Sequence, residues 1–421
     1  DIEAALKRAA PGFLKTVGVW NPSEEQITNP YYGTATDPIS TWQMLRMQLS
    51  QDYTVTQVDL SSGRVPGDVD VLVVVGPESF TDAEVFAVDQ FLMRGGSLIV
   101  ASGSYHIDPY QMSDGLLMAP IEKGLADLLA HHGVTIGAGM VMDPQNEPFP
   151  MQIPRNVGGM TVYEIQQINY PYFVDVRNDA MSDDSSIVSS LPAITLQWVS
   201  PLEIDETKNA GREVVTLLSS TEASWIRDAA EVQPDLNTYP EYGFAVEGEQ
   251  RSRPLAVSIR GSFESYFKDK ESPFATGKTP EGEQLSAEQE QTLAQDTIEQ
   301  SPDSTRLVVV GSSEFLDDAV LEISQSQSTD RYLNNLQFLQ NAVDWAVEDE
   351  DLLTIRSRGA YARALNPLTT SEESFWEGLN YAVGLLGLVA IGFVWNSRRR
   401  NEEPMQLLEP VQSDAVKEGN R

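Results

Sequence analysis

Cysteine is absent from this chain of 421 residues, and histidine is scarce, with three residues in all. Without cysteine the protein can form no disulfide, no thiolate metal site and no thiol nucleophile. His131 and His132 come just before Gly133, at the expected end of a helix, where the helix dipole favours an imidazolium ion. His106 and Asp108 form a His-x-Asp pair without a third ligand, which is a weak metal signal. The sequence therefore predicts no metal centre.

The sequence patterns of several enzyme classes are also missing. No G-x-x-x-x-G-K-[ST] loop occurs, so we expect no ATP hydrolysis by the chain alone, and no G-x-G-x-x-G opens a helix after a strand. Ser102 and Ser104 follow a predicted strand, where α/β hydrolases place their nucleophile, but ASGSYHID is not G-x-S-x-G. A Ser-Asp-His triad would need its histidine on a later loop, whereas His131 and His132 end a predicted helix. We therefore predict a protein without enzymatic activity and without a cofactor.

Basic residues are few, with 28 Lys and Arg against 63 Asp and Glu, and the formal net charge is −35. Nucleic acids and anionic lipid headgroups both need a basic face, so the chain is not expected to bind nucleic acid. Solubility, a basic partner and a salt-rich habitat each explain such acidity, and the sequence does not distinguish them.

One long apolar run, from Leu379 to Trp395, carries no charge. A bilayer-spanning helix needs about 20 apolar residues, with a lower limit of about 17, and aromatic residues often flank it. We therefore predict a stalk at 359–374 and a transmembrane helix at 375–397. A buried core helix is the alternative.

Three arginines, Arg398–Arg400, follow the run directly. The positive-inside rule then places the tail, 398–421, in the cytoplasm and the bulk of the chain outside it, at the cell (inner) membrane. Because the chain begins at Asp1, we expect a signal or a first membrane span to precede it. Insertion as a tail anchor is the alternative.

Residues 1–133 alternate predicted strands with predicted helices, which indicates a parallel sheet flanked by helices. The predicted strands are Thr16–Trp20, Tyr53–Leu60, Val69–Val75 and Ser97–Ala101. The predicted helices are Pro38–Ser50, Asp82–Arg94 and Ile121–His132. The fold class is therefore α/β.

Residues 134–267 are interpreted as a β-rich elaboration on the same sheet, or as a subdomain. Residues 268–305 are polar and acidic, and they predict a mobile insertion. Residues 306–358 predict a closing α/β unit of the first sheet. It contains a strand at Arg306–Val310, a helix at Arg331–Val347 and a strand at Leu352–Arg356.

Two segments resemble each other: residues 71–82 read VLVVVGPESFTD, and residues 307–318 read LVVVGSSEFLDD. Parallel strands deliver their following loops to one edge of the sheet, where ligands usually bind. We therefore expect the turns after Val75, Ala101 and Val310 to converge. They carry the candidate ligand-binding or partner-binding residues Gly76, Glu78, Ser79, Ser102, Gly103, Ser104, Gly311, Ser312, Ser313 and Glu314. Ordinary solvated turns are the alternative.

Several stretches in this order resemble the gliding-motility-associated auxiliary proteins of ABC transporters. They are VDVLVVVGPESFTDAEVFAVDQFLMRGGSLIVASG, LAVSIRGSFESYF, RLVVVGSSEFLDD and NNLQFLQNAVDWAVEDEDLLTIRSRG, followed by the C-terminal apolar run. Each motif alone is mainly hydrophobic and of modest specificity. Members commonly begin with another membrane segment, which this sequence lacks.

The resemblance implies a fold like the class I glutamine amidotransferases and flavodoxin-like domains. Active amidotransferases carry a cysteine after a central strand, so that activity is excluded here. The resemblance further implies a non-catalytic extracytoplasmic subunit that partners an ABC permease and a separate ATPase, with its cargo unknown. A membrane-anchored hydrolase or carbohydrate-binding protein is the alternative function.

Overall fold

The computed structural model describes residues 15–23, 27–28, 35–36, 41–107, 117–122, 124–157, 160–270, 273–274, 297–327, 331–347 and 370–400. The chain divides into two compact units, Asp1–Arg363, named the body, and Ala364–Arg421, named the C-terminal unit. The predicted strand 352–356, the tail beyond Arg400 and most of the stalk and of the acidic insertion lie outside the described residues.

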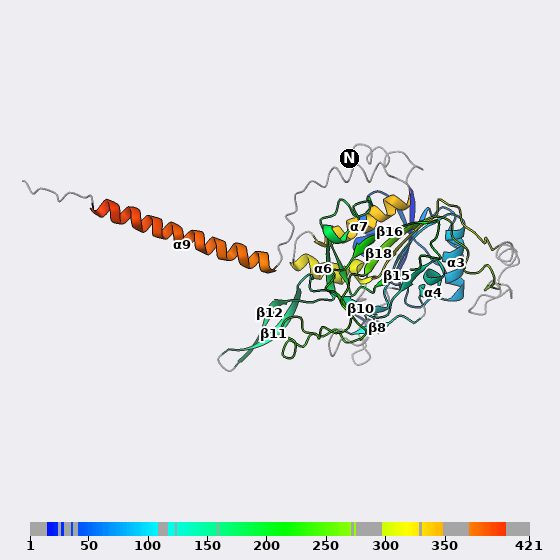
Figure 1. The fold of residues 1–421 in the computed structure, drawn as a ribbon. Coiled ribbons are helices and arrows are strands. Elements are labelled where there is room, and N and C mark those ends of the chain that lie inside the picture. Colours follow the sequence, from blue (N-terminus) through cyan, green and yellow to red (C-terminus); the bar gives the residue numbers. More distant parts are fainter. Residues whose placement is uncertain are drawn as a thin grey trace, which may run out of the picture. The chain divides into compact units, whose positions relative to one another are not determined.

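A seven-stranded sheet runs through the body in the order β16-β18-β19-β6-β5-β1-β4 (Figure 1). Its strands are β1 (Thr16–Trp20), β4 (Thr54–Gln57), β5 (Val71–Val75), β6 (Ser97–Ala101), β16 (Glu213–Ser219), β18 (Pro254–Arg260) and β19 (Arg306–Val310). The strands from β19 to β4 are all parallel. β18 is antiparallel to β19, and β16 is antiparallel to β18. A parallel core is therefore confirmed, and two antiparallel strands from residues 134–267 extend it at one edge.

The central strands form because most of their residues are apolar on both faces, and many are β-branched. β5, β6 and β19 are buried at every position, as expected for strands covered from both sides. Alternate residues of β5 enter two different cores. Val71, Val73 and Val75 pack in one core, and Leu72 and Val74 pack in the other.

Helices cover both faces of the sheet. The helices of the body are α2 (Gln43–Leu49), α3 (Asp82–Met93), α4 (Ala126–His131), α6 (Asp318–Gln327) and α7 (Arg331–Ala346), with 3-10 turns η2 (Asn178–Ala180) and η3 (Glu314–Leu316). The apolar faces of α2 and α7 join the core of Val71 and Val73, whereas those of α3 and α4 join the core of Leu72 and Val74. This arrangement is a three-layer α/β fold.

Local signals explain where α3 and α4 begin. Thr81 caps α3 in a reciprocal capping box with Glu84, which fixes the predicted start at Asp82. The prediction of a helix from Ile121 to His132 is wrong at its start. Residues 121, 122, 124 and 125 are not helical, Gly124 lies against the Pro77 carbonyl oxygen, and the helix begins only at Ala126.

The chain between α4 and β19 builds short antiparallel pairs and a third core. The pairs are β9 (Val134–Ile136) with β15 (Leu202–Ile204), β10 (Met140–Met142) with β17 (Trp225–Arg227), β11 (Phe149–Val157) with β12 (Met160–Ile168), and β13 (Phe173–Arg177) with β14 (Ala193–Gln197). Two further pairs are β2 (Ile27–Thr28) with β3 (Ala35–Thr36) and β7 (Tyr105–Ile107) with β8 (Met118–Pro120). Aromatic residues dominate the third core, among them Tyr170, Tyr172, Phe173, Trp198 and Trp225.

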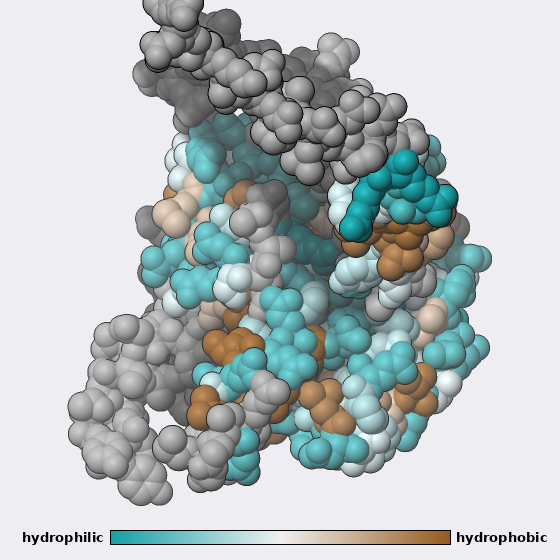
Figure 2. Space-filling view, turned by 90° about the vertical axis from the view of Figure 1, so that its left-hand side faces the viewer, coloured by the Kyte–Doolittle hydropathy of each residue, from teal (hydrophilic) through white to brown (hydrophobic). Residues whose placement is uncertain are grey.

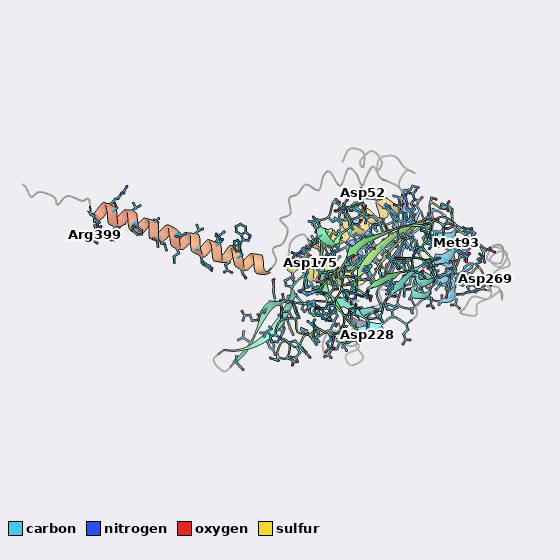
Figure 3. The ribbon with its side chains drawn as sticks, in the orientation of Figure 1. Asp52, Met93, Asp175, Asp228, Asp269 and Arg399 are labelled. Atoms are coloured by element: carbon cyan, nitrogen blue, oxygen red, sulfur yellow. The ribbon has the colours of Figure 1, made fainter. Side chains whose placement is uncertain are left out.

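The described part of the C-terminal unit is one long helix, α9 (Thr370–Arg400). Its side chains from Ser374 onward are exposed on all sides (Figure 3). Residues 374–400 are long and apolar enough to cross a membrane, by length and composition. Among the described helices it is the one that meets this test.

The face shown in Figure 2 is mostly hydrophilic, and its hydrophobic residues form small separate groups. Such a surface suits a chain of net charge −35.

Candidate functional site

The turns after β5, β6 and β19 lie side by side because these three strands are neighbours in register. Val75 is opposite Ala101, and Ala101 is opposite Val310. The ladder continues beyond the strands, since Gly76 N donates to Ala101 O at 2.9 Å and Ser102 N donates to Val310 O at 3.0 Å. The predicted convergence of the three turns is confirmed. Binding by these turns stays a prediction.

Because Gly103 and Gly311 have no side chain, another segment of the same chain packs closely against the turns. This segment is residues 197–201, named the edge cap. Ser200 N donates to Gly311 O at 2.7 Å, and a Cβ at Gly311 would overlap the Ser200 carbonyl oxygen. A Cβ at Gly103 would lie 3.0 Å from Gly311 O. The edge cap begins its turn at Trp198, whose φ of 46° is in the left-handed region that non-glycine residues seldom adopt.

The hydroxyls of the turns are used inside the body. Ser104 Oγ lies 2.7 Å from Ser200 Oγ and donates to Gly139 O at 3.0 Å. Ser312 Oγ donates to Gln197 O at 2.6 Å, so both serines hold the edge cap. Ser102 Oγ donates to the neighbouring Gly103 O, and Ser313 Oγ donates to Glu314 Oε1 at 3.2 Å.

Glu78 and Ser79 remain accessible at this edge. Ser79 is exposed, and the Glu78 side chain is 39 % exposed. Ser79 lines a cavity of about 650 Å³ between the start of α3 and α4, together with Asp82, Glu122 and Asp127. The open part of the edge is therefore acidic.

Glu78 contacts His106, which the sequence did not connect with it. His106 Nδ1 lies 3.1 Å from Glu78 Oε1. Burial by itself lowers the pKa of His106, but the hydrogen bond and the negative charge of Glu78 oppose it, and the pKa of His106 is raised. Glu314 is buried, and burial raises its pKa to about 8, with a further rise from Asp317. Near neutral pH Glu314 is therefore protonated, and it lies close to the contact between Glu78 and His106.

The rule that turns after parallel strands converge could have found this cluster, because His106 follows β6 as Glu78 follows β5. Asp108 lies outside the described residues. Within the residues that the structure describes, no group of three or more His, Cys, Asp or Glu is placed to hold a metal ion.

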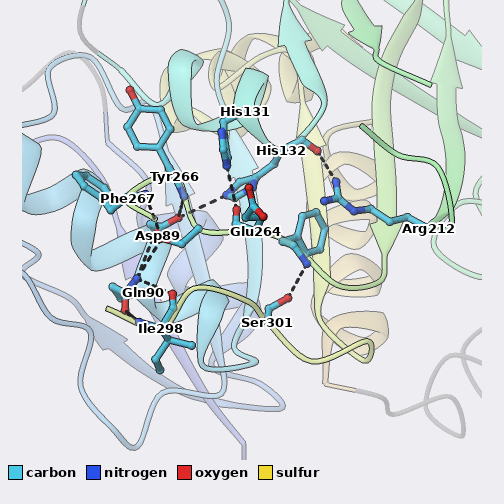
Figure 4. A network of polar contacts seen from close by, with 12 residues as sticks. Asp89, Gln90, His131, His132, Arg212, Glu264, Tyr266, Phe267, Ile298 and Ser301 are labelled. Atoms are coloured by element: carbon cyan, nitrogen blue, oxygen red, sulfur yellow. Dashed lines mark hydrogen bonds and ion pairs between the residues drawn. The ribbon is translucent and has the colours of Figure 1, made fainter. Parts of the chain in front are cut away.

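A second histidine–carboxylate pair lies between α3 and α4 (Figure 4). Asp89 accepts from Ser265 Oγ at 2.6 Å and from Tyr266 N at 2.8 Å. The neighbouring Gln90 exchanges hydrogen bonds with the backbone of Ile298. Asp89 therefore holds the chain just before the acidic insertion, and Gln90 holds the last part of the insertion itself. Burial raises the pKa of Asp89 against these hydrogen bonds.

The prediction of an imidazolium ion at the end of α4 is wrong for His132. Its side chain is fully buried, 3.9 Å from Asp89 Oδ1, and packs edge-on against Phe263 at 5.4 Å. Burial lowers the pKa of His132 to about 3, and the positive charges of His131 and Arg212 add to the effect. Loss of hydration outweighs the helix dipole, so the ring is neutral.

Comparison with known proteins gives one family and two distant structural likenesses. A family model described as an ABC-type uncharacterized transport system, of the auxiliary kind, matches residues 15–342. No curated protein matches the chain. The mmIFT52 N-terminal domain aligns with a TM-score of 0.39 at 13% identity, covering 78% of this chain and 96% of that one. A ThuA-like protein from Bacteroides uniformis aligns with a TM-score of 0.34 at 10% identity, covering 79% and 91%. Such low scores support no argument about this protein.

Proposed function

Since this chain belongs to the auxiliary family of an ABC-type uncharacterized transport system, we propose that it is a non-catalytic subunit of such a system. It acts outside the cytoplasm by binding partner subunits or cargo. Its partners are an ABC permease and a separate ATPase, as in gliding-motility-type systems. We also infer that the body is a variant of the class I amidotransferase-like fold.

The family match is the observation that carries this proposal, because it spans residues 15–342, nearly the whole body. The structure of the sheet edge supports it. Of the two serines in the position of a hydrolase nucleophile, Ser104 holds the edge cap through hydrogen bonds with Ser200 and Gly139, and Ser102 Oγ donates to the neighbouring Gly103 O. The alternative of a membrane-anchored hydrolase or carbohydrate-binding protein has no comparable support.

The helix α9 supports attachment to the membrane, because its residues 374–400 are long and apolar enough to cross one and their side chains are exposed. We propose that Arg398–Arg400 keep the tail in the cytoplasm and that the body lies on the other side. A reporter that works only in the cytoplasm, fused after Arg421, is expected to be active. Activity of a reporter that works only outside the cytoplasm would reverse the orientation.

Purification of the tagged full chain from its own membranes in mild detergent tests the function. We expect the permease and the ATPase to co-purify in a fixed ratio, while an unrelated single-span protein with the same tag retains neither. A chain that purifies alone and shows hydrolase turnover, lost in Ser104→Ala or His106→Ala, would replace this function with the alternative.

A further inference from the structure

The hairpin β11–β12 extends from the rest of the body as a separate two-stranded arm (Figure 1). A lone two-stranded hairpin is only marginally stable in water. Large apolar side chains are nevertheless exposed along it, with Val162 at 49%, Tyr163 at 66% and Ile165 at 69% exposure. An exposed apolar arm of this kind indicates a binding surface.

The arm also differs from the rest of the chain in charge. Residues 149–168 contain one basic and one acidic residue, Arg155 and Glu164, in a chain of net charge −35. A second copy of the chain would bring its own acidic body to the arm, and repulsion between the bodies opposes such a dimer. Anionic lipid headgroups are repelled in the same way. A protein partner without net negative charge is left as the occupant.

The register of the arm shows which backbone groups are available. Pro150 lies opposite Gln167, and Pro154 lies opposite Tyr163. Opposite residues in an antiparallel ladder either exchange both hydrogen bonds or exchange none, and proline has no N–H to donate. These pairs are therefore non-hydrogen-bonded, and alternation makes the pair that contains Ile165 non-hydrogen-bonded too.

It follows that the N–H and C=O groups of Tyr163, Ile165 and Gln167 point away from β11. In the described residues β12 pairs with β11 alone, so this edge is open. The other strand, β11, contacts α6 and lacks two donors at its prolines. The arm thus has one edge that can accept a further strand and one that is obstructed.

We propose that the open edge of β12 binds an extended segment of a partner subunit of the transport system, by addition of a strand. The segment is apolar at alternate positions, to cover Tyr163 and Ile165, and carries basic residues that the acidic body attracts. Main-chain hydrogen bonds supply affinity in such complexes, and alternate side chains supply specificity. This inference rests on the proposed function, since it concerns the same partners.

Photocrosslinking in the intact membrane tests the location. A benzophenone amino acid replaces Tyr163 or Ile165 in the full chain, and Met47, which is 62% exposed on α2, serves as the control position. We expect both β12 positions, and not position 47, to crosslink to a peptide of a transporter subunit. Crosslinks to a second copy of the chain, to lipid alone or to nothing would overturn the proposal.

The variant Ile165→Pro tests the mechanism, because it removes an N–H that the hairpin itself does not use. Co-purification of the transporter subunits should fall about tenfold or more, whereas Ile165→Val, which keeps the N–H and the apolar side chain, should retain them. Unchanged co-purification with Ile165→Pro would overturn strand addition while leaving the proposed function intact. If the wild-type chain retains no subunit at all, the proposed function fails first.

Discussion

Two histidine–carboxylate pairs in the body show how differently burial and contact act on the same chemistry. His106 lies 3.1 Å from Glu78 at the accessible edge of the sheet, and its pKa is raised. His132 lies 3.9 Å from Asp89, with both side chains fully buried, and its pKa is lowered to about 3. A close, partly hydrated carboxylate stabilises imidazolium, whereas a buried carboxyl at a longer distance does not offset lost hydration.

The two carboxylates have different partners, and this explains why the two histidine pKa values shift in opposite directions. Asp89 directs its oxygens to Ser265 and to the backbone of Tyr266, so it positions the chain rather than the histidine (Figure 4). Glu78 makes its ion pair with His106 at a surface turn. The first pair is accessible at the edge of the sheet, and the second pair is part of the core. Four predictions test this contrast, in order of decreasing effect.

Asp89→Ala should have the largest effect, because it leaves the Tyr266 N–H and the Ser265 hydroxyl without their buried acceptor. We expect the free energy of unfolding to fall by about 3 kcal/mol, which lowers the thermal midpoint of the full chain in detergent by several degrees. Asp127→Ala, at an exposed position of α4, is the matched control. Equal midpoints for the two variants would show that the Asp89 network contributes little.

His132 should make the protein less stable in acid. Its folded pKa of about 3 lies below the usual value of 6.5, so between these pH values the unfolded chain binds a proton that the native chain does not bind. The free energy of unfolding is therefore at its full value above pH 6.5 and decreases as the pH falls toward 3. When the pH is lowered from 7 to 4.5, the free energy of unfolding of His132→Phe should decrease by on the order of 2 kcal/mol less than that of the wild type. Parallel acid profiles of the thermal midpoint for the two proteins would contradict a buried neutral ring.

Glu314→Gln should stabilise the protein at alkaline pH. The native state keeps the Glu314 proton up to pH of about 8, whereas the unfolded chain releases it above its usual 4.5, so stability falls between these values as the pH rises. Glutamine cannot ionise, so the variant should have a free energy of unfolding on the order of 1 kcal/mol higher than the wild type at pH 8. The gain is limited because the amide of glutamine must also be buried. The gain should shrink at pH 5. Glu322→Gln, exposed on α6, should show no such dependence, and an equal response in both would argue against the burial effect.

Glu78→Gln should have the smallest effect, because Glu78 is 39% exposed and solvent screens its charge. The raised pKa of His106 provides stability that is present below about 6.5 and is lost as the pH rises through the folded pKa. The free energy of unfolding of the variant should therefore be lower than that of the wild type by less than about 1 kcal/mol at pH 6, and by still less at pH 9. Glu203→Gln, exposed on β15, is the control, and the His106 titration followed by NMR measures the pKa directly. A titration that does not move to lower pH in Glu78→Gln would show that the ion pair does not form in solution.

The sequence predicted those features of the site that depend on neighbouring strands. β1, β6 and β19 have the predicted bounds, because short, mostly apolar runs between turn residues allow few alternatives. The convergence of the three turns followed from parallel pairing alone. The candidate residues were therefore placed on the correct edge, and their function as a binding site stays a prediction.

The edge cap could not be predicted, because it reaches the turns from far away in the chain. Ser200 is 96 residues from Ser104, and no periodicity or motif links the two. The state of His132 was missed for the same reason. Phe263, which packs against its ring, belongs to a segment more than a hundred residues further along. A helix end is recognisable from sequence, whereas its burial depends on what packs over it.

The sequence by itself determined the α/β class, the absence of thiol chemistry, the acidity and the long apolar helix near the C-terminus, because each follows from residue types and local spacing. Only the tertiary structure decided that the edge serines hold a cap, that one histidine pairs with a surface carboxylate while another is buried, and that an apolar hairpin extends with one open edge. Burial and hydrogen-bond partners are set by contacts between distant segments, and these determine the charge and the accessibility of a side chain.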